Sequence, residues 1–327
     1  MVQFSALSKA LEDAKVLART DDSLRVEGRY RGFCVRLSAR RDPETGDETL
    51  AIEIDAPGSV NLHRDSTFTT LMSGRDLQLG IAEFDQLVRI GQIDERQAFA
   101  LFDAATRAQV MELLRRGGSF DFGVAKLTLS TVPSVETLRE EMQRCIAIAE
   151  RMSEVKANVT QALQKNAMHE ADETFRARCL RLLEAREQLT PEIAKSALRC
   201  VLPLCQLVGA RFLRDVPVMT RLACEQPSVS RAALEDLIAW KMMPPLEKLL
   251  GAFALEHSLE WQKQVLVDVE LRGELRHLAQ LQTATRNVSR ELRGHVARAS
   301  RAIRDRAPAG AGELSLSEDR AGALSKD

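Results

Sequence analysis

Residues that could do acid, base or metal chemistry are sparse in this chain of 327 residues. None of its five histidines has a second histidine or a cysteine at the spacing of a metal site: His63, His169, His257, His277 and His295. No G-x-S-x-G elbow, Walker phosphate loop or G-x-G-x-x-G turn occurs. We therefore expect isolated surface histidines, no catalytic centre, no metal and no cofactor.

Two stretches of the N-terminal part could still suggest an enzyme. The Asp-Phe-Gly triplet at Asp121 resembles a kinase motif, but the glycine-rich loop, the strand lysine and the His-Arg-Asp loop of kinases are missing. Asp85, Arg89 and His63 are the polar residues to test for a catalytic site in this part. An N-terminal active site remains the least favoured of three functional hypotheses.

The cysteines indicate a reducing compartment. The chain has six cysteines and no C-x-x-C pair, and most of the cysteines fall on apolar helical faces, as buried thiols do. Charged residues interrupt the first twenty positions, so no secretory signal is expected. No apolar run is long enough to span a bilayer. We expect a soluble cytoplasmic protein without membrane insertion.

One region has a strong local charge. The C-terminal arginine cluster comprises Arg286, Arg290, Arg293, Arg298, Arg301, Arg304 and Arg306. Seven arginines against Glu291 and Asp305 leave an excess of five positive charges, which suits phosphate contacts or an acidic partner. The favoured interpretation is a polar helix that caps a helical array, because Glu313, Glu318 and Asp319 follow closely and could neutralise the cluster.

The elements that must position these residues fall into four segments. We expect an α+β module at 1–132, a long connecting helix at 133–168, helical repeats at 169–306 and a disordered tail at 307–327. Aromatic residues make up only 4% of the chain, so the cores must be aliphatic.

The module begins with a short amphipathic helix predicted from the apolar residues between Phe4 and Leu17. Alternating residues then predict strands at 24–30, 33–39, 50–54, 60–63 and 87–90, with Arg31-Gly32 as a hairpin turn. A helical pair around 98–101 and 110–114 and a last hairpin around 119–129 complete it. The segment from Gly80 to Asp85 resembles one in uncharacterised bacterial α+β proteins, a resemblance that implies no activity.

Ser134 is the expected N-cap of the long helix. Its apolar seam runs from Leu138 through Met142 and Cys145 to Leu163. Two interpretations remain: docking on the first repeat, which is favoured, and self-dimerisation as a coiled coil.

The repeats are clearest between Ser228 and Leu250, where two helices are separated by Pro244-Pro245. We expect prolines to open several of the helices, Pro227 among them. Apolar positions recur at steps of about 29 to 30 residues; Leu246 and Leu249, for example, are followed by Leu275 and Leu278.

This pattern resembles the HEAT family of helical repeats over roughly residues 172–306; an irregular helical bundle is the alternative. The resemblance implies an all-α solenoid whose second helices line a concave face. It places Arg221, Glu247, Lys248, Arg276 and His277 in that groove, as a tentative partner-binding row.

Three functions follow, in order of preference. The first is a non-catalytic protein-interaction adaptor or scaffold, and the second is a nucleic-acid-binding protein that uses the arginine cluster. HEAT-like DNA glycosylases use aromatic and acidic residues on a concave face, but the helix phases of Trp240, Trp261, Asp236 and Asp268 do not place these residues as one set. The third is the N-terminal enzyme.

Overall fold

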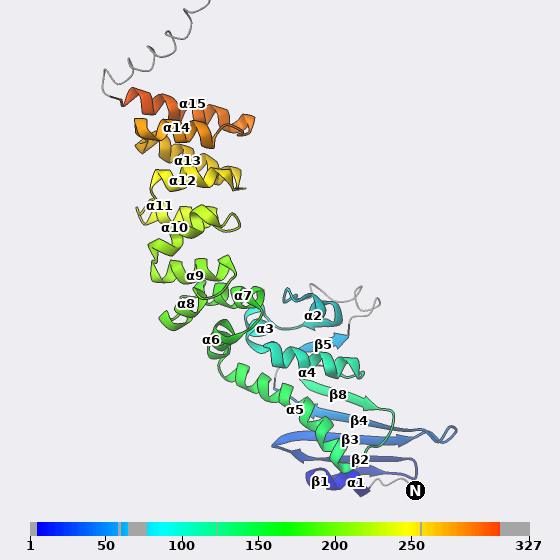
Figure 1. The fold of residues 1–327 in the computed structure, drawn as a ribbon. Coiled ribbons are helices and arrows are strands. Elements are labelled where there is room, and N and C mark those ends of the chain that lie inside the picture. Colours follow the sequence, from blue (N-terminus) through cyan, green and yellow to red (C-terminus); the bar gives the residue numbers. More distant parts are fainter. Residues whose placement is uncertain (1–4, 58–59, 65–76, 122, 256, 308–327) are drawn as a thin grey trace, which may run out of the picture. The chain divides into compact units, whose positions relative to one another are not determined.

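A computed structural model describes residues 5–57, 60–64, 77–121, 123–255 and 257–307 (Figure 1). The chain divides into two compact units, Met1–Ile193 and Ala194–Asp327. The first, here called the sheet unit, holds an antiparallel sheet with helices, and the described part of the second, the helical unit, holds helices alone. The predicted order of an α+β part followed by a helical part is confirmed. The predicted tail lies outside the described residues, except for Ala307.

The sheet has eight strands in the order β1-β2-β3-β4-β8-β7-β5-β6, and neighbouring strands pair antiparallel. The strands are β1 (Glu12–Arg19), β2 (Ser23–Tyr30), β3 (Phe33–Arg41), β4 (Glu48–Asp55), β5 (Asn61–Arg64), β6 (Val88–Gly91), β7 (Ser119–Asp121) and β8 (Val124–Leu129). The predicted hairpin between β2 and β3 is confirmed. Arg31 and Gly32 both have positive φ, 51° and 84°, as a two-residue hairpin turn of the primed type requires.

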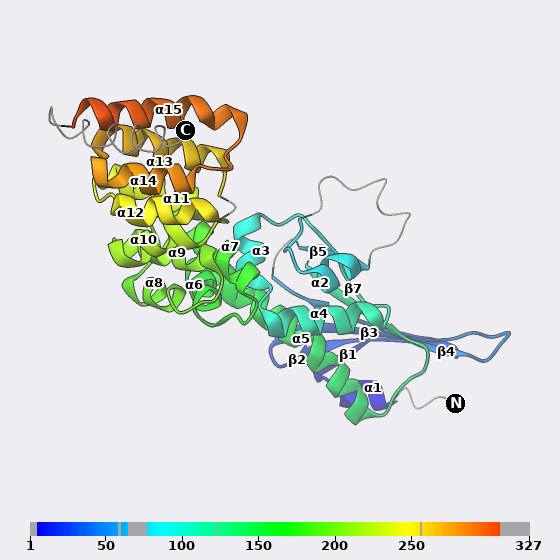
Figure 2. The same cartoon turned by 45° about the horizontal axis from the view of Figure 1, so that its top comes forward.

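Strand alternation explains the core of the sheet unit. Val26, Leu37 and Ile52 lie on one face and are at most 1% exposed, whereas their neighbours along each strand are more exposed. Helix α5 (Val135–Ala157) packs against β4, and α1 (Ser5–Lys9) packs against β1 and β2 (Figure 2). The apolar face is therefore the one that the helices cover.

The predicted N-terminal helix is mostly wrong. Among the described residues of this stretch, only Ser5–Lys9 are helical, and the chain then forms β1. Two register shifts interrupt the pairing of β1 with β2, and Asp13 has a positive φ of 50°. These bulges disturb the strand's period of two, so its apolar residues recur at steps that resemble a helix.

The predicted long helix is two helices, α5 and α6 (Val159–His169). Asn158 separates them and serves as both C-cap and N-cap, and its side-chain oxygen accepts a hydrogen bond from Gln161 N–H at 3.0 Å. The seam residues Leu138 and Met142 are buried where α5 packs on β4 and α4 (Ala104–Arg115). The α5 part of the seam therefore docks on the sheet unit's own elements. Helix α6, which carries the seam residue Leu163, packs against α7 (Glu173–Glu184), where the predicted repeats begin, so the predicted docking holds for this part alone.

Buried charged side chains hold the C-terminal end of α3 (Glu95–Leu101). Arg107, Arg151 and Asn166 donate to three backbone carbonyls at this end, at 2.8 to 2.9 Å. Arg107 also pairs with the buried Glu170 at 3.3 Å, and Arg151 pairs with Asp103 at 3.3 Å. These contacts satisfy the carbonyls that a helix leaves free at its end. The remaining helices of this unit are α2 (Ala82–Leu87) and α7 (Glu173–Glu184).

The described part of the helical unit consists of helices connected by short turns. They are α8 (Pro191–Ala197, which begins in the sheet unit), α9 (Pro203–Leu213), α10 (Val216–Glu225), α11 (Ser230–Ala239), α12 (Leu246–Gly251), η2 (Ala252–Ala254), α13 (Leu259–Arg272), α14 (Leu275–Ala284) and α15 (Arg290–Asp305). Helix α13 packs against both α11 and α15, and α12 packs against α14.

Two details of the predicted repeat can be compared with these helices. Leu246 and Leu249 are buried in the core, as expected. Pro245 is the N-cap of α12. Pro227 does not open α11, however, because it lies in the turn before the helix begins at Ser230.

Candidate interaction surface

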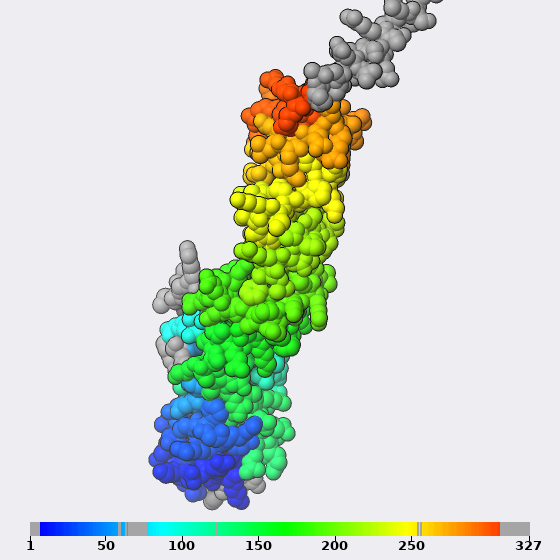
Figure 3. All heavy atoms as spheres, turned by 90° about the vertical axis from the view of Figure 1, so that its left-hand side faces the viewer, coloured from blue at the N-terminus to red at the C-terminus, as the bar shows by residue number. Residues whose placement is uncertain are grey.

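Helix α15 is amphipathic and packs on α13 and α14. Leu292, Ala299 and Ile303 are at most 1% exposed, and Val296 is packed against the same core. Ile303 fits against Gly273 in the α13–α14 turn, where an added Cβ would come within 2.9 Å of the Ile303 side chain. One face of α15 is thus fixed on the helical unit, and its atoms (red) form part of the molecular surface (Figure 3).

The opposite face carries four exposed arginines: Arg290, Arg293, Arg301 and Arg304. We call these four residues the arginine stripe. At 3.6 residues per turn they fall within an arc of about 80° and extend over about 21 Å of helix. No stripe arginine forms an ion pair or a side-chain hydrogen bond within the part of the chain that the structure describes. The exposed Gly294 and Ala297 lie between the two arginine pairs.

The other members of the arginine cluster behave differently. Arg298 pairs with Glu270 at 3.9 Å and donates to His295 Nδ1 at 2.9 Å. Arg306 donates to the carbonyl oxygens of Glu270 and Gly273 at 2.5 and 2.8 Å, so it closes the end of α13. Arg286 is exposed in the turn before α15. The cluster therefore divides into two structural arginines (Arg298 and Arg306), the exposed Arg286 and the arginine stripe. This division follows from the helix phase and from contacts with α13.

The expected partner-binding row contains an interhelical bridge. His277 is only 3% exposed, so the expectation that it faces a solvent-filled groove is wrong. Its Nδ1 accepts from the backbone N–H of Glu274 at 3.0 Å, which leaves the proton on Nε2 for Glu247 Oε1 at 2.9 Å. Glu247 also pairs with Arg276 at 3.8 Å. Its own backbone N–H and then His277 lower the pKa of the Glu247 carboxyl.

The rest of that row is dispersed among different partners. Arg221 donates to Gln206 Oε1 at 2.6 Å, and Lys248 is exposed on α12. The positive charge of Arg276 is shared with Glu274 as well, at 3.0 Å. Within the row, Glu247 pairs with Arg276 and His277, whereas Arg221 and Lys248 have no ion pair among the described residues. The row therefore does not present one continuous set of free cations, which makes it a weaker candidate surface than the arginine stripe.

The N-terminal candidates show a structural role for Asp85. Its carboxylate accepts three backbone N–H groups, from Leu79, Gly80 and Ile81, at 2.7 to 2.9 Å. These bonds hold the turn before α2 and occupy the lone pairs that a general base would use. His63 and Arg89 are register partners in β5 and β6; the side chain of His63 lies outside the described part.

The aromatic and acidic residues considered for a glycosylase-like face are buried or paired. Trp261 lies in the core, Asp268 pairs with Arg272 at 2.5 Å, and Asp236 pairs with Arg211 at 2.8 Å.

The cysteines are free thiols. Burial raises the pKa of Cys145 to about 12 and that of Cys224 to about 11, so neither is a ready nucleophile.

In the described ranges, no group of three or more metal-ligating side chains comes together. None of the helices described combines the length and apolar character needed to cross a bilayer.

A scan against protein-family models, a search of curated proteins and a search of solved structures each give no match. Functional inference for this chain therefore rests on its own residues.

Proposed function

We propose that this chain is a non-catalytic adaptor that binds an acidic segment of a partner protein through the arginine stripe on α15. The observation that carries the proposal is a set of four exposed arginines on one face of a well-packed helix, none of them paired with another described residue. Like charges three residues apart destabilise a helix by a few tenths of a kcal/mol. A stripe of this kind is better explained by a ligand than by the stability of the fold.

The helix arrangement supports a HEAT-like array as the scaffold. Helices α11, α13 and α15 begin at Ser230, Leu259 and Arg290, at steps of about thirty residues. The packing of α13 against α11 and α15, together with that of α12 against α14, suits two layers of stacked helix pairs. In such an array α15 would close the last pair and present its outer face to a partner.

Three features favour a protein partner over nucleic acid. The chain has a net charge of −1, so the stripe is a local feature and not part of a basic protein. Helix α15 has no Phe, Tyr or Trp on which bases could stack. The small side chains of Gly294 and Ala297 leave room at the middle of the stripe for close approach of a partner's peptide backbone. The planar arginine forks themselves suit carboxylates and phosphates alike.

The test places a photo-crosslinking amino acid at Ala297, in the centre of the stripe, in full-length protein expressed in its native cells. We expect a crosslinked protein whose attached segment is rich in Asp and Glu. The same probe at Ala239, an exposed residue of α11, is the matched control and should give no such product.

Variants of the stripe then separate charge from geometry. Changing its four arginines to glutamate should abolish the crosslink, and changing them to lysine should weaken it, because lysine keeps the charge but loses the bidentate fork. Crosslinking to nucleic acid, with affinity falling steeply as salt rises, would favour the nucleic-acid alternative. Turnover of a small molecule by the purified protein, with no stoichiometric partner, would contradict the adaptor.

A further inference from the structure

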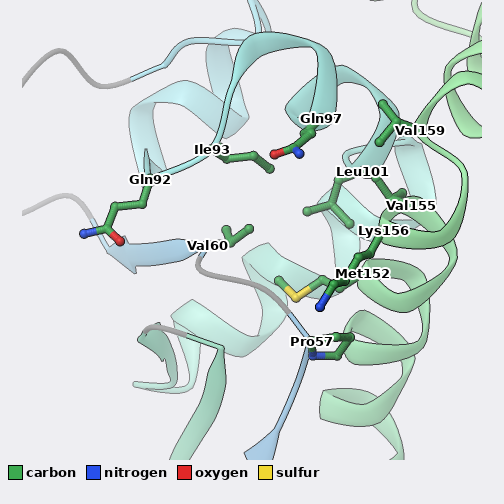
Figure 4. A pocket seen from close by; sticks show the side chains of 10 residues that line it. All are labelled: Pro57, Val60, Gln92, Ile93, Gln97, Leu101, Met152, Val155, Lys156 and Val159. Atoms are coloured by element: carbon green, nitrogen blue, oxygen red, sulfur yellow. The ribbon is translucent and has the colours of Figure 1, made fainter.

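The sheet unit contains a cavity of about 190 Å³ that is independent of the arginine stripe. It lies between α3, α5, the start of α6, and the segments next to β4, β5 and β6. Its described lining residues are Pro57, Val60, Gln92, Ile93, Gln97, Leu101, Met152, Val155, Lys156 and Val159 (Figure 4). We call it the α3–α5 cavity.

The walls of this cavity are apolar. Seven of the ten lining residues are aliphatic, proline or methionine, and Leu101, Met152 and Val155 belong to the buried core. The cavity opens to solvent, because Gln92, Gln97 and Lys156 among its lining residues are exposed. Its apolar walls gain free energy when an apolar group replaces water against them. The walls therefore suit an aliphatic ligand group.

Two polar side chains face the same space. Figure 4 shows Gln97 and Lys156 pointing into the ring of lining residues, whereas Gln92 points away from its centre. Neither Gln97 nor Lys156 has a side-chain partner in the described part of the chain. An ammonium and an amide thus converge on an apolar space, which is the arrangement of a small-molecule site with a few orienting groups.

The helix dipole explains why a lysine occupies position 156, but it does not explain the direction of the lysine side chain. Lys156 lies in the last turn of α5, where the helix dipole favours a cation. That preference would be met equally by a side chain directed into solvent. Lys156 is itself exposed to solvent, but its side chain lies at the cavity beside Met152, a direction that the helix dipole does not require.

We propose that the α3–α5 cavity binds a small aliphatic carboxylate, with the carboxylate on Lys156 Nζ and the Gln97 amide. The tail would lie against Val60, Leu101 and Val159. A cavity of about 150 Å³ holds benzene, so one of about 190 Å³ accommodates about eight non-hydrogen atoms by simple scaling. Hexanoate has this size, and its charge complements the unpaired ammonium.

The test is isothermal titration calorimetry of the full chain with hexanoate and, separately, with 1-hexanol. We expect saturable hexanoate binding and at least about tenfold weaker binding of the uncharged alcohol, because a charge-assisted hydrogen bond is lost. Lys156→Met should weaken hexanoate binding by a similar factor. Lys165→Met is the matched control, since Lys165 is exposed on α6 and does not line the cavity.

A second variant tests the location of the tail. Val159→Phe places a larger side chain into the cavity and should abolish hexanoate binding, while circular dichroism stays that of the wild type. Each opposite result overturns the proposal: no saturable hexanoate binding, equal binding of hexanol, unchanged binding by Lys156→Met or Val159→Phe, or an equal loss in Lys165→Met.

Discussion

The two units use charged side chains in opposite ways. The sheet unit buries Arg107, Arg151, Glu141 and Glu170, and each has a partner of opposite charge. The described core of the helical unit buries a single carboxylate, that of Asp268, while the arginine stripe stays exposed. Paired buried charges tie elements together but are costly when one partner is missing. Exposed charges add little to the stability of a fold, so stability does not explain the arginine stripe, and the proposed partner would.

A charge introduced into the helical core gives the largest expected effect. Leu249 is 0% exposed, so Leu249→Asp would bury a carboxylate without a partner. We expect the free energy of unfolding to fall by about 4 to 5 kcal/mol. Both tryptophans, Trp240 and Trp261, lie in the helical unit, so tryptophan fluorescence in urea follows this unit. The matched control is Lys248→Asp, exposed on the same helix, which should change stability by less than about 0.5 kcal/mol.

Breaking a buried pair in the sheet unit should cost nearly as much. Arg107→Met leaves the Glu170 carboxylate, 2% exposed, without its cation and removes a hydrogen bond to the α3 terminus. We expect a loss of about 3 to 4 kcal/mol, measured by circular dichroism in urea. Arg115→Met is the control, because Arg115 pairs with Glu83 at the surface. Unchanged stability in Arg107→Met would mean that the buried pair does not hold α3, α4 and α6 together.

The sequence predicts the hairpin strands of the sheet unit better than it predicts the first strand or the break in the long helix. Hairpin β2–β3 can be predicted because buried residues such as Val26 and Leu37 alternate with polar residues along the strands, and because Arg31-Gly32 supplies the turn. Strand β1 cannot, because its bulges destroy the period of two. The break at Asn158 had a local signal, since asparagine is a strong N-cap, but the helical period on both sides hides it.

For the candidate surfaces, prediction from the sequence is limited by contacts between residues that lie far apart in the chain. The excess of arginine near the C-terminus is visible in the sequence, yet which arginines are free depends on Glu270 and the end of α13. The burial of His277 depends on Glu247, thirty residues earlier. The α3–α5 cavity has no sequence signal, because its lining comes from three separate stretches of the chain, within residues 57–60, 92–101 and 152–159.

His257 makes the helical unit sensitive to acid. Its ring stacks on Trp261 with centroids 3.9 Å apart and lies 3.2 Å from the Cys224 carbonyl oxygen and 2.9 Å from Ser230 Oγ. Burial lowers the pKa of His257 below its ordinary value. The unfolded chain therefore takes up a proton first as the pH falls. The stabilising contribution is complete above about pH 6.5 and decreases below it, by up to about 1.4 kcal/mol per pH unit.

This dependence can be measured with urea titrations followed by tryptophan fluorescence between pH 7.5 and about 5. His257→Gln should lower stability at neutral pH and flatten its slope below pH 6.5. His169→Gln, at an exposed position in the sheet unit, should keep the wild-type slope. A wild-type slope in His257→Gln would assign the acid sensitivity to another group.

The smallest expected effect on stability concerns the arginine stripe. It tests directly whether the exposed charges of the helical unit, unlike the buried pairs of the sheet unit, contribute nothing to stability. Changing the four stripe arginines to glutamine removes two pairs of like charges three residues apart, Arg290 with Arg293 and Arg301 with Arg304. Each such pair destabilises a helix by about 0.2 to 0.5 kcal/mol, so the variant should be as stable as the wild type or more stable by up to about 1 kcal/mol. The paired Arg298 and Arg306 remain unchanged as an internal control. A loss of more than about 1 kcal/mol would give the stripe a structural role and contradict its use as a partner surface. Equal or higher stability, combined with loss of the crosslink at Ala297, would mean that these arginines are kept for binding and not for the fold.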